Sequence, residues 1–353
     1  MDNTTNSAPN PYVDEFTGAT LTSPGATVVP TPTAKNLSAQ IAPDTSGVTF
    51  DSSDNQWVSV CGSESDFGRL AEFTTTTLAT LTGKPSAAPT PDVIISDSGS
   101  GKSVNCPWNA TFDSNGNLWV ANSNEFTAPP GFVTEYQPGQ LTKTGNPVPF
   151  VTLTDTTDKF VSPTGVVFDS AGDLIVSDFG PDQFSPAPAG SAKILVFDAA
   201  TLAKLTSGTN DVAAHATLTD PSIGSPVNGA FDNAGNLWVA DCGASEIYMF
   251  PKAALSTGAK SASAIFKSTI VTGTSEKSLN CPGGVTFDTS GNLWYTNFFG
   301  TGTGVNGDVG EFTAAQLASA PASSTPQPHI FLVADTAGNG LSFPLGLIFG
   351  PQF

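Results

Sequence analysis

Amide, carboxylate and indole side chains recur beside short apolar runs in this sequence, and their types favour ligand binding. Carboxylate and amide oxygens are ligands that calcium prefers, and an indole ring beside amides suits a sugar or another polar ring. The candidate binding residues are Trp108, Asn109, Asn122, Asp178, Asn228, Asp241 and Asn297. The structural alternative is that the Asn and Asp side chains after the second strands cap loop backbone and that Trp108 fills the mouth of a channel.

The usual agents of catalysis are sparse. The two histidines, His215 and His329, lie in apolar runs that we expect at the outer rim of the fold. No Gly-x-Ser-x-Gly elbow and no Gly-rich phosphate loop leading into a helix occurs, and the single arginine is Arg69. We find no catalytic constellation, so the balance is against an enzyme.

The elements that must position these residues are repeated. The phrase FDSNGNLWVAN at 112–122 returns four times in close variants. Its opening Phe, with one more Phe near the C-terminus, marks the anchors Phe50, Phe112, Phe168, Phe231, Phe287 and Phe349. The anchors stand 56 to 63 residues apart, which suits a four-stranded propeller blade with long loops. Each phrase predicts a hairpin around an Asp-x-x-Gly turn.

Two further apolar runs follow each hairpin, and no long helix is indicated. The sequence therefore predicts an all-β, six-bladed β-propeller with four-stranded blades, a single domain over 1–353. The segment 13–21 (VDEFTGATL) reads as a third strand without a hairpin, and 346–350 (GLIFG) reads as a first strand without one. We expect the ring to close by pairing of these N- and C-terminal segments in one blade of three or four strands.

The composition excludes several partners. The chain has 12 Lys+Arg against 31 Asp+Glu, a formal net charge of −19, which repels nucleic acid and anionic membranes. No apolar run is long enough to span a membrane, and the first ten residues are too polar for a signal peptide. The protein is then either cytosolic or a mature form without its export signal.

The four cysteines favour a mature form that was exported. Cys61 and Cys242 follow second strands, and Cys106 and Cys281 open first strands in the similar phrases KSVNCPWN and KSLNCPGG. Both places belong to one face of a propeller, so Cys61–Cys106 and Cys242–Cys281 is the connectivity that makes the two bridges equivalent. Free thiols or a metal site are the alternative, although no Cys-x-x-Cys spacing supports zinc. Disulfides indicate an oxidising compartment.

The repeated phrase P-x-G-V-x-F-D-x-x-G-N-L-W-V-A-D/N resembles NHL repeats and the related propellers of the gluconolactonase (senescence-marker) family and the streptogramin lyases. In gluconolactonase-like enzymes, as the resemblance implies, a divalent metal is held by Glu, Asn and Asp side chains at the start of innermost strands. The matching positions here are Ser46, Trp108, Thr164, Val227, Gly283 and Leu345. None is a carboxylate, and the histidine base implied by the lyases has no counterpart near the centre.

These observations predict a secreted, periplasmic or cell-surface monomer that binds a small polar ligand, a glycan or a protein partner at the disulfide-bearing face. A calcium ion is one candidate occupant. A metal-assisted hydrolase or lyase acting at the channel mouth is the alternative, and a structural cell-surface protein is a further one. Long variable loops on that face leave room for a tailored pocket, which the tight turns on the other face do not.

Overall fold

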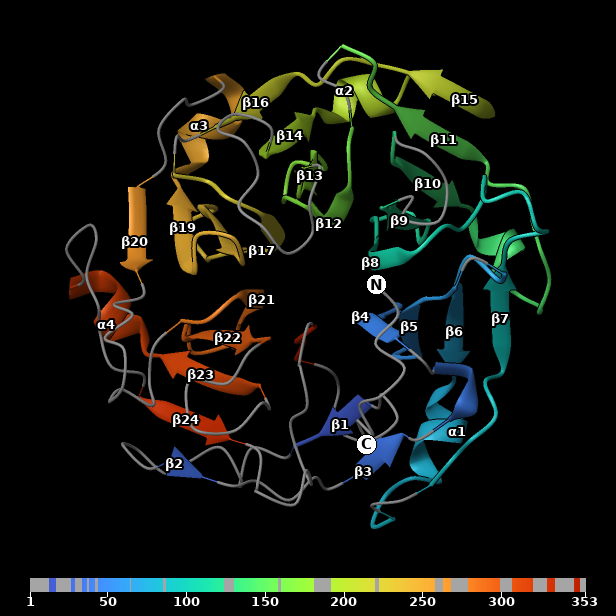
Figure 1. Ribbon diagram of the computed structural model, residues 1–353, viewed down its shortest axis with the longest axis horizontal. Helices are drawn as coiled ribbons and strands as arrows, with labels where there is room; N and C mark the ends of the chain where they lie inside the picture. Colours follow the sequence, from blue (N-terminus) through green and yellow to red (C-terminus); the bar gives the residue numbers. More distant parts are fainter. Residues whose placement is uncertain are drawn as a thin grey trace.

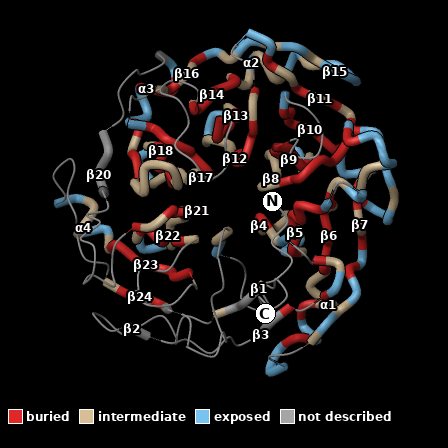
Figure 2. The backbone as a smooth tube through the Cα atoms, in the orientation of Figure 1, coloured by how far each residue is buried: buried red, intermediate tan, exposed pale blue. Residues whose placement is uncertain are grey.

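The structure is a computed structural model of the 353-residue chain. It describes residues 13–16, 27–28, 34–36, 38–41, 44–63, 65–84, 87–123, 130–157, 160–180, 192–219, 222–257, 263–267, 279–298, 307–319, 329–333 and 346–349. These residues form five blades arranged around a central axis, with the first strand of each blade innermost (Figure 1). Buried residues concentrate on the strands of the blades, and exposed ones on the outer loops (Figure 2).

The strands of each blade follow one another outward along the chain. The first blade contains β4 (Asp44–Phe50), β5 (Gln56–Cys61), β6 (Arg69–Phe73) and β7 (Val93–Ser96). The second contains β8 (Pro107–Phe112), β9 (Leu118–Asn122), β10 (Phe132–Tyr136) and β11 (Val151–Thr154). The third contains β12 (Pro163–Phe168), β13 (Leu174–Asp178), β14 (Lys193–Phe197) and β16 (Ala216–Leu218).

The last two blades repeat this order. The fourth contains β17 (Pro226–Phe231), β18 (Leu237–Asp241), β19 (Glu246–Phe250) and β20 (Ser263–Lys267). The fifth contains β21 (Pro282–Phe287), β22 (Leu293–Asn297), β23 (Asp308–Phe312) and β24 (Ile330–Val333). Short helices follow four third strands: α1 (Thr75–Ala79), α2 (Ala199–Leu202), α3 (Lys252–Thr257) and α4 (Ala314–Ser319). The 3-10 turns are η2 (Ala39–Ile41) and η3 (Pro138–Gln140).

The prediction of six four-stranded blades is wrong. The described residues form five blades of four or five strands and a separate two-stranded sheet of β1 (Val13–Glu15) and β3 (Ala34–Asn36). Residues 346–349 form no strand, so the predicted pairing of the terminal segments does not occur among the described residues. The physical reason lies in the repeat: neither terminal segment carries the apolar second-strand phrase, which pairs on both sides within every complete blade.

The terminal segments nevertheless pack beside the neighbouring blades. Phe349 meets Trp294 edge-on at 5.8 Å between ring centroids, which repeats the contact between Trp238 and Phe287 at 5.9 Å. Leu347 and Phe16 pack against the buried cluster that contains Trp294. Residues from both ends of the chain therefore cover the fifth blade.

Two blades gain a fifth strand at the outer edge. The strand β15 (Gly208–Asp211) pairs in parallel with β11 of the preceding blade, and β2 (Thr27–Val28) pairs in parallel with β24. An isolated parallel bridge between Ile95 and Gly145 continues the pattern on β7. These pairings cover outer strands whose free N–H and C=O groups would otherwise invite pairing with another chain.

No described helix is long and apolar enough to cross a membrane.

Candidate functional site

A register shift near the start of the first strand recurs in all five blades. It falls between Thr45 and Gly47, Pro107 and Asn109, Pro163 and Gly165, Pro226 and Gly229, and Pro282 and Gly284. An extra residue of this kind bends the strand and re-aims a side chain, which is why bulges are frequent beside binding sites. In the second blade the extra residue is Trp108, and in the fourth blade the shift contains Asn228.

Trp108 is half-buried, and its indole Nε1 is a buried donor with no hydrogen-bond partner among the described residues. Its ring lies 6.2 Å from that of Phe179, at an interplanar angle of 40°. A buried donor without a partner costs about 1–3 kcal/mol, so native proteins contain few of them. The Nε1 atom itself is covered, so a ligand at this place would contact the open part of the half-buried ring.

Asn109 and Asn228 lie on either side of β12. The Oδ1 of Asn109 accepts the N–H of Val166 at 3.3 Å, and the Oδ1 of Asn228 accepts the N–H of Gly229 at 2.8 Å. A Cβ at Gly165 would lie 3.2 Å from the Asn228 Oδ1 and 2.4 Å from a backbone oxygen, so this close approach requires glycine. Trp108, Asn109 and Asn228 therefore gather around β12, and we call this group the inner-strand mouth.

The other four predicted site residues, Asn122, Asp178, Asp241 and Asn297, are fully buried. Asp178 accepts the N–H groups of Val161 and Ser162 at 2.9 and 2.8 Å, and Asp241 binds Gly224 and Ser225 in the same way. The amide oxygens of Asn122 and Asn297 accept the N–H groups of Asn105 and Asn280, both at 2.9 Å. All four cap the segment that enters the first strand of their own blade, so none is exposed to a ligand.

Burial also changes the pKa of the two aspartates among these four residues. It raises the pKa of Asp241 to about 6 and raises the pKa of Asp178, although backbone N–H groups oppose the change in both. Asp178 directly precedes Phe179, and Asp241 pairs across the sheet with Pro226, close to Asn228. Two buried carboxyl groups therefore lie at the ends of β13 and β18.

Two disulfides hold this face. Cys61 is bonded to Cys106 and Cys242 to Cys281, the pairing expected from the sequence, and each joins neighbouring blades. Cys106 lies two residues before Trp108 and has a left-handed backbone with φ of 48°. Such a conformation costs about 1–2 kcal/mol outside glycine and needs support from its surroundings. The first disulfide supplies that support next to the mouth.

Sequence reasoning missed the loop that leads to Cys106. The carboxylate of Asp97 accepts the N–H groups of Gly99, Ser100, Gly101, Lys102 and Ser103 at 2.7, 2.5, 2.8, 3.0 and 2.9 Å. The hydroxyl of Ser103 donates a further bond at 2.6 Å. Although burial opposes the change, these bonds hold the pKa of Asp97 well below its usual range. The run of small residues DSGSGKS is the only sequence signal of this carboxylate-centred loop.

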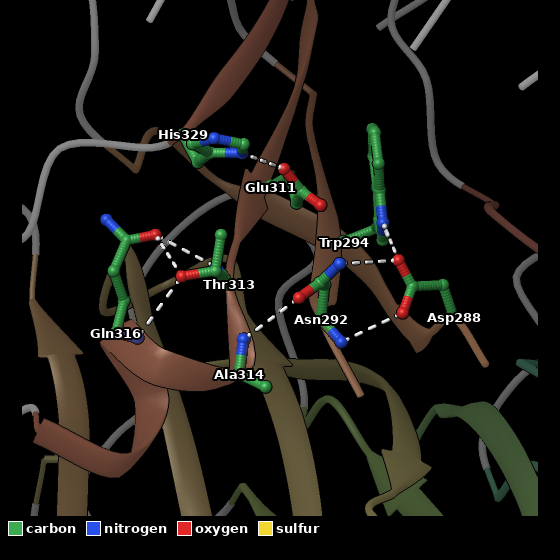
Figure 3. A network of polar contacts seen from close by, with 8 residues as sticks. All are labelled: Asp288, Asn292, Trp294, Glu311, Thr313, Ala314, Gln316 and His329. Carbon is green, nitrogen blue, oxygen red and sulfur yellow. Dashed lines mark hydrogen bonds and ion pairs between the residues drawn. The ribbon is translucent and has the colours of Figure 1, made fainter. Parts of the chain in front are cut away.

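The opposite face consists of tight turns whose polar groups are satisfied within the chain. In the fifth blade, Asp288 accepts bonds from the side-chain nitrogens of Asn292 and Trp294 at 2.8 and 3.2 Å (Figure 3). The Oδ1 of Asn292 accepts the N–H of Ala314, which ties the turn to α4. Because the same bonds recur in the first, second and fourth blades, this face offers few free groups to a ligand.

A buried glutamate lies opposite the repeat tryptophan in three blades. Glu72, Glu135 and Glu311 pair across the sheet with Trp57, Trp119 and Trp294. The Oε2 of Glu311 contacts Nδ1 of His329 at 2.7 Å (Figure 3), whereas neither of the other two forms an ion pair among the described residues. Burial, reinforced by Asp51 near Glu72 and by Asp113 near Glu135, raises the pKa of both carboxyls to about 7.

These two glutamates predict greater stability in mild acid. Between the unfolded pKa near 4.5 and the folded pKa near 7, the folded protein holds protons that the unfolded chain releases, so the free energy of unfolding falls as pH rises. We expect a loss of about 1–3 kcal/mol per glutamate between pH 4.5 and 8. Below pH 4 the free energy of unfolding should fall again as pH falls. The folded-state pKa values of Asp97, Asp232 and Asp288 are lowered, so the unfolded chain takes up protons there before the folded protein does.

Denaturant unfolding at several pH values tests this prediction. Glu72→Gln and Glu135→Gln imitate the protonated carboxyl, so the double variant should flatten the pH dependence and be more stable than the parent at pH 8. Glu311→Gln is the matched control, since it removes the negative charge from the contact with His329 and should destabilise instead. An unchanged slope between pH 5 and 8 in the double variant would contradict the assignment.

No family model matches the chain, and no curated protein is detectably similar to it in sequence. Among solved structures, it resembles the extracellular domain of a proposed one-component system from B. thetaiotaomicron, with 18% identity, a TM-score of 0.47, and coverage of 82% of this chain and 32% of that one. It also resembles an aldose sugar dehydrogenase from Streptomyces coelicolor, with 13% identity, a TM-score of 0.48, and coverage of 79% and 83%.

A gluconolactonase from Xanthomonas campestris is a third neighbour, with 17% identity, a TM-score of 0.43, and coverage of 72% of this chain and 69% of that one. Streptogramin B lyase is another similar structure. Gluconolactonases and streptogramin lyases are also the enzymes that the repeat phrase resembles. The chain spans about a third of the length of the B. thetaiotaomicron protein.

Proposed function

We propose that this protein is a secreted or cell-surface binding module that holds a small polar ligand at the inner-strand mouth. The half-buried ring of Trp108 supports the proposal most directly, because it stands at the first-strand bulge of the second blade and leaves part of an indole face open to a ligand. The two disulfides support an oxidising compartment, since such bonds persist outside the reducing cytosol.

The position of the inner-strand mouth in the fold also supports a binding role. Its three residues lie near the start of innermost strands, where a bulge recurs, while the strands around them form a rigid and buried scaffold. The residues at the bulge differ from blade to blade, from Ser46 to Trp108 to Thr164, while the turns on the opposite face stay alike. Side chains that vary at one face of a repeated scaffold are typical of a ligand-binding surface.

Replacing Trp108 with Ala tests the proposal. If the ring serves binding, the variant should bind its ligand at least tenfold more weakly and lose less than about 1 kcal/mol of stability. Trp119→Ala is the control: its ring is buried and packs edge-on against Phe168, so truncation should cost about 3–5 kcal/mol. A large loss of stability in Trp108→Ala with unchanged binding would show that the ring is only a plug.

The alternative, a metal-assisted hydrolase or lyase, can be separated by metal analysis of the purified protein. Among the described residues, no three His, Cys, Asp or Glu side chains are grouped so as to hold a metal ion. A stoichiometric divalent metal, calcium included, whose removal abolishes an activity would favour that alternative. Ligand binding that persists in the presence of a chelator favours the binding module.

A further inference from the structure

We propose that Asn228 is a site of spontaneous covalent modification, at which the backbone nitrogen of Gly229 attacks the side-chain amide and the asparagine becomes aspartate or isoaspartate. The basis is the geometry of the pair, in which the N–H of Gly229 donates to the Oδ1 of Asn228 at 2.8 Å. The inference concerns the chemistry of the chain itself and does not depend on the function proposed above.

The reaction exchanges the amide nitrogen of the side chain for an oxygen of water. The nitrogen of Gly229 gives its proton to water or hydroxide and bonds to Cγ of Asn228, while the side-chain nitrogen takes up a proton and leaves as ammonia. One water molecule then adds to either carbonyl carbon of the five-membered imide, and the bond from that carbon to the ring nitrogen breaks. Opening at Cγ gives aspartate and opening at the backbone carbon gives isoaspartate, so water is the only other reactant.

The two reacting atoms are already close together. The Cγ atom of Asn228 is one C=O bond away from its Oδ1, so it lies within about 4 Å of the Gly229 nitrogen. Rotation about the Cβ–Cγ bond turns the face of the amide toward this nitrogen. Reacting atoms that are held near one another in the ground state react faster than atoms that must first meet.

The attacking nitrogen is not needed by the β-sheet. The N–H of Asp232 donates to the carbonyl of Asn236 at 3.0 Å, which marks a hydrogen-bonded pair. Bonded and unbonded pairs alternate along an antiparallel ladder, so the pair Gly229–Val239, three positions further, is unbonded. The N–H of Gly229 therefore faces the inner edge of β17, which is the terminal strand of its sheet. Attack by this nitrogen breaks no hydrogen bond of the ladder.

The backbone on the other side of Asn228 is also outside the ladder. The register shift between Pro226 and Gly229 leaves Val227 and Asn228 without cross-strand partners, as is usual for the extra residues of a bulge. Closing the five-membered ring requires the backbone of Asn228 to rotate, and an unpaired residue rotates at lower cost than a paired one. Asn228 and Gly229 are half-buried, so water reaches the imide.

Packing requires a glycine after Asn228. A Cβ at position 229 would lie 2.9 Å from the carbonyl oxygen of Trp238 and 3.2 Å from Cδ1 of Leu237. Because glycine has no side chain, its nitrogen is also the least hindered in an attack on the preceding residue. The reactive pair is therefore a consequence of how β17 packs on β18.

The other Asn-Gly pair among the described residues has the opposite arrangement. Asn115 is exposed, but the N–H of Gly116 donates to the carbonyl of Asp113 at 3.1 Å, within a turn that holds the glycine at φ of 79°. The Gly116 nitrogen must break that bond before it reaches the side chain of Asn115. We expect Asn115 to be converted more slowly than Asn228, although exposure alone would predict the reverse.

Conversion changes the inner-strand mouth. Either product adds a negative charge at position 228, and isoaspartate also lengthens the backbone of β17 by one methylene group. Aged and newly made protein therefore differ in charge and in strand geometry at this place.

Peptide mapping by mass spectrometry during incubation at pH 8 measures the conversion at each Asn-Gly pair, and enzymatic methylation of isoaspartate identifies the isomer. In the folded protein we expect Asn228 to be converted at least tenfold faster than Asn115. In the reduced chain in denaturant the two pairs should react at similar rates, because neither arrangement remains. Asn228→Gln is the matched variant: it keeps the amide but needs a six-membered ring, so position 228 should stay unmodified while Asn115 reacts as in the parent.

Three results would overturn the inference. The first is a folded protein, verified by near-UV circular dichroism, in which Asn228 is not converted. The second is conversion of Asn115 in the folded protein at the rate of Asn228 or faster. The third is a difference between the two pairs that persists unchanged in denaturant, because the local sequence and not the fold would then determine it.

Discussion

Reduction of both disulfides is expected to lower the free energy of unfolding by about 8 kcal/mol and the melting temperature by about 10 °C. The bridges close loops with sequence separations of 45 and 39 residues, and in the chain-entropy model each constrains the unfolded chain by about 4 kcal/mol. Calorimetry with and without reductant measures the change. Alkylation of four thiols in the unreduced protein, seen by intact mass, would show that the bridges do not form.

A pair of variants separates chain entropy from backbone strain at the first bridge. Cys61→Ala with Cys106→Ala loses the bond but keeps a non-glycine residue at φ of 48°. Cys61→Ala with Cys106→Gly loses the same bond and removes the left-handed strain, so it should be more stable by about 1 kcal/mol. Equal stability of the two variants would mean that the backbone relaxes once the bridge is gone.

Asp97→Ala is expected to lower the free energy of unfolding by about 3–5 kcal/mol. The carboxylate organises the loop 97–103 through bonds from five backbone N–H groups at 2.5–3.0 Å and from the Ser103 hydroxyl. Hydrogen bonds to a charged group contribute about 1.5–3 kcal/mol each, and several fail together when it is removed. Since Ser103 O also accepts from the Tyr136 hydroxyl at 2.7 Å, the loss should reach the second blade.

Denaturant unfolding and amide hydrogen exchange measure this effect. Protection of the amides of Gly101, Lys102 and Ser103 should fall most. Asp211→Ala is the control, because that exposed carboxylate accepts, among the described residues, from the N–H and hydroxyl of Thr156 alone and should cost much less stability than Asp97→Ala. If the amides of 101–103 stay protected in Asp97→Ala, the carboxylate does not organise the loop.

The local structure of the repeat follows from the sequence alone. Asp113 binds the N–H groups of Asn115 and Asn117, two and four residues along, so the Asp-x-x-Gly turn is determined within five residues. The left-handed Gly116, with φ of 79°, is equally local. The cysteine pairing could also be predicted, because repeated hairpins place the ends of second strands and the starts of first strands on one face.

The number of blades was decided by tertiary structure. A blade exists only if all its strands pair, and the terminal segments contribute β1, β3 and the unpaired residues 346–349 instead of a complete set. The parallel additions of β2 and β15 depend on contacts between blades that no local pattern indicates. Pairing between distant segments is a property of the closed assembly, and periodicity within one repeat does not determine it.

Tertiary structure also decided which of the predicted site residues are accessible to a ligand. Asn122 and Asn109 are the same residue type on adjacent strands of one blade. Asn122 is fully buried with its amide bonded to Asn105 N–H, Val120 O and Thr134 Oγ1, whereas Asn109 is half-buried and its amide oxygen accepts the N–H of Val166 in the described part of the chain. The sequence determined which side chains could bind. Which of these side chains are already hydrogen-bonded to backbone groups was decided only by the tertiary structure. The backbone groups concerned belong to segments that folding brings together.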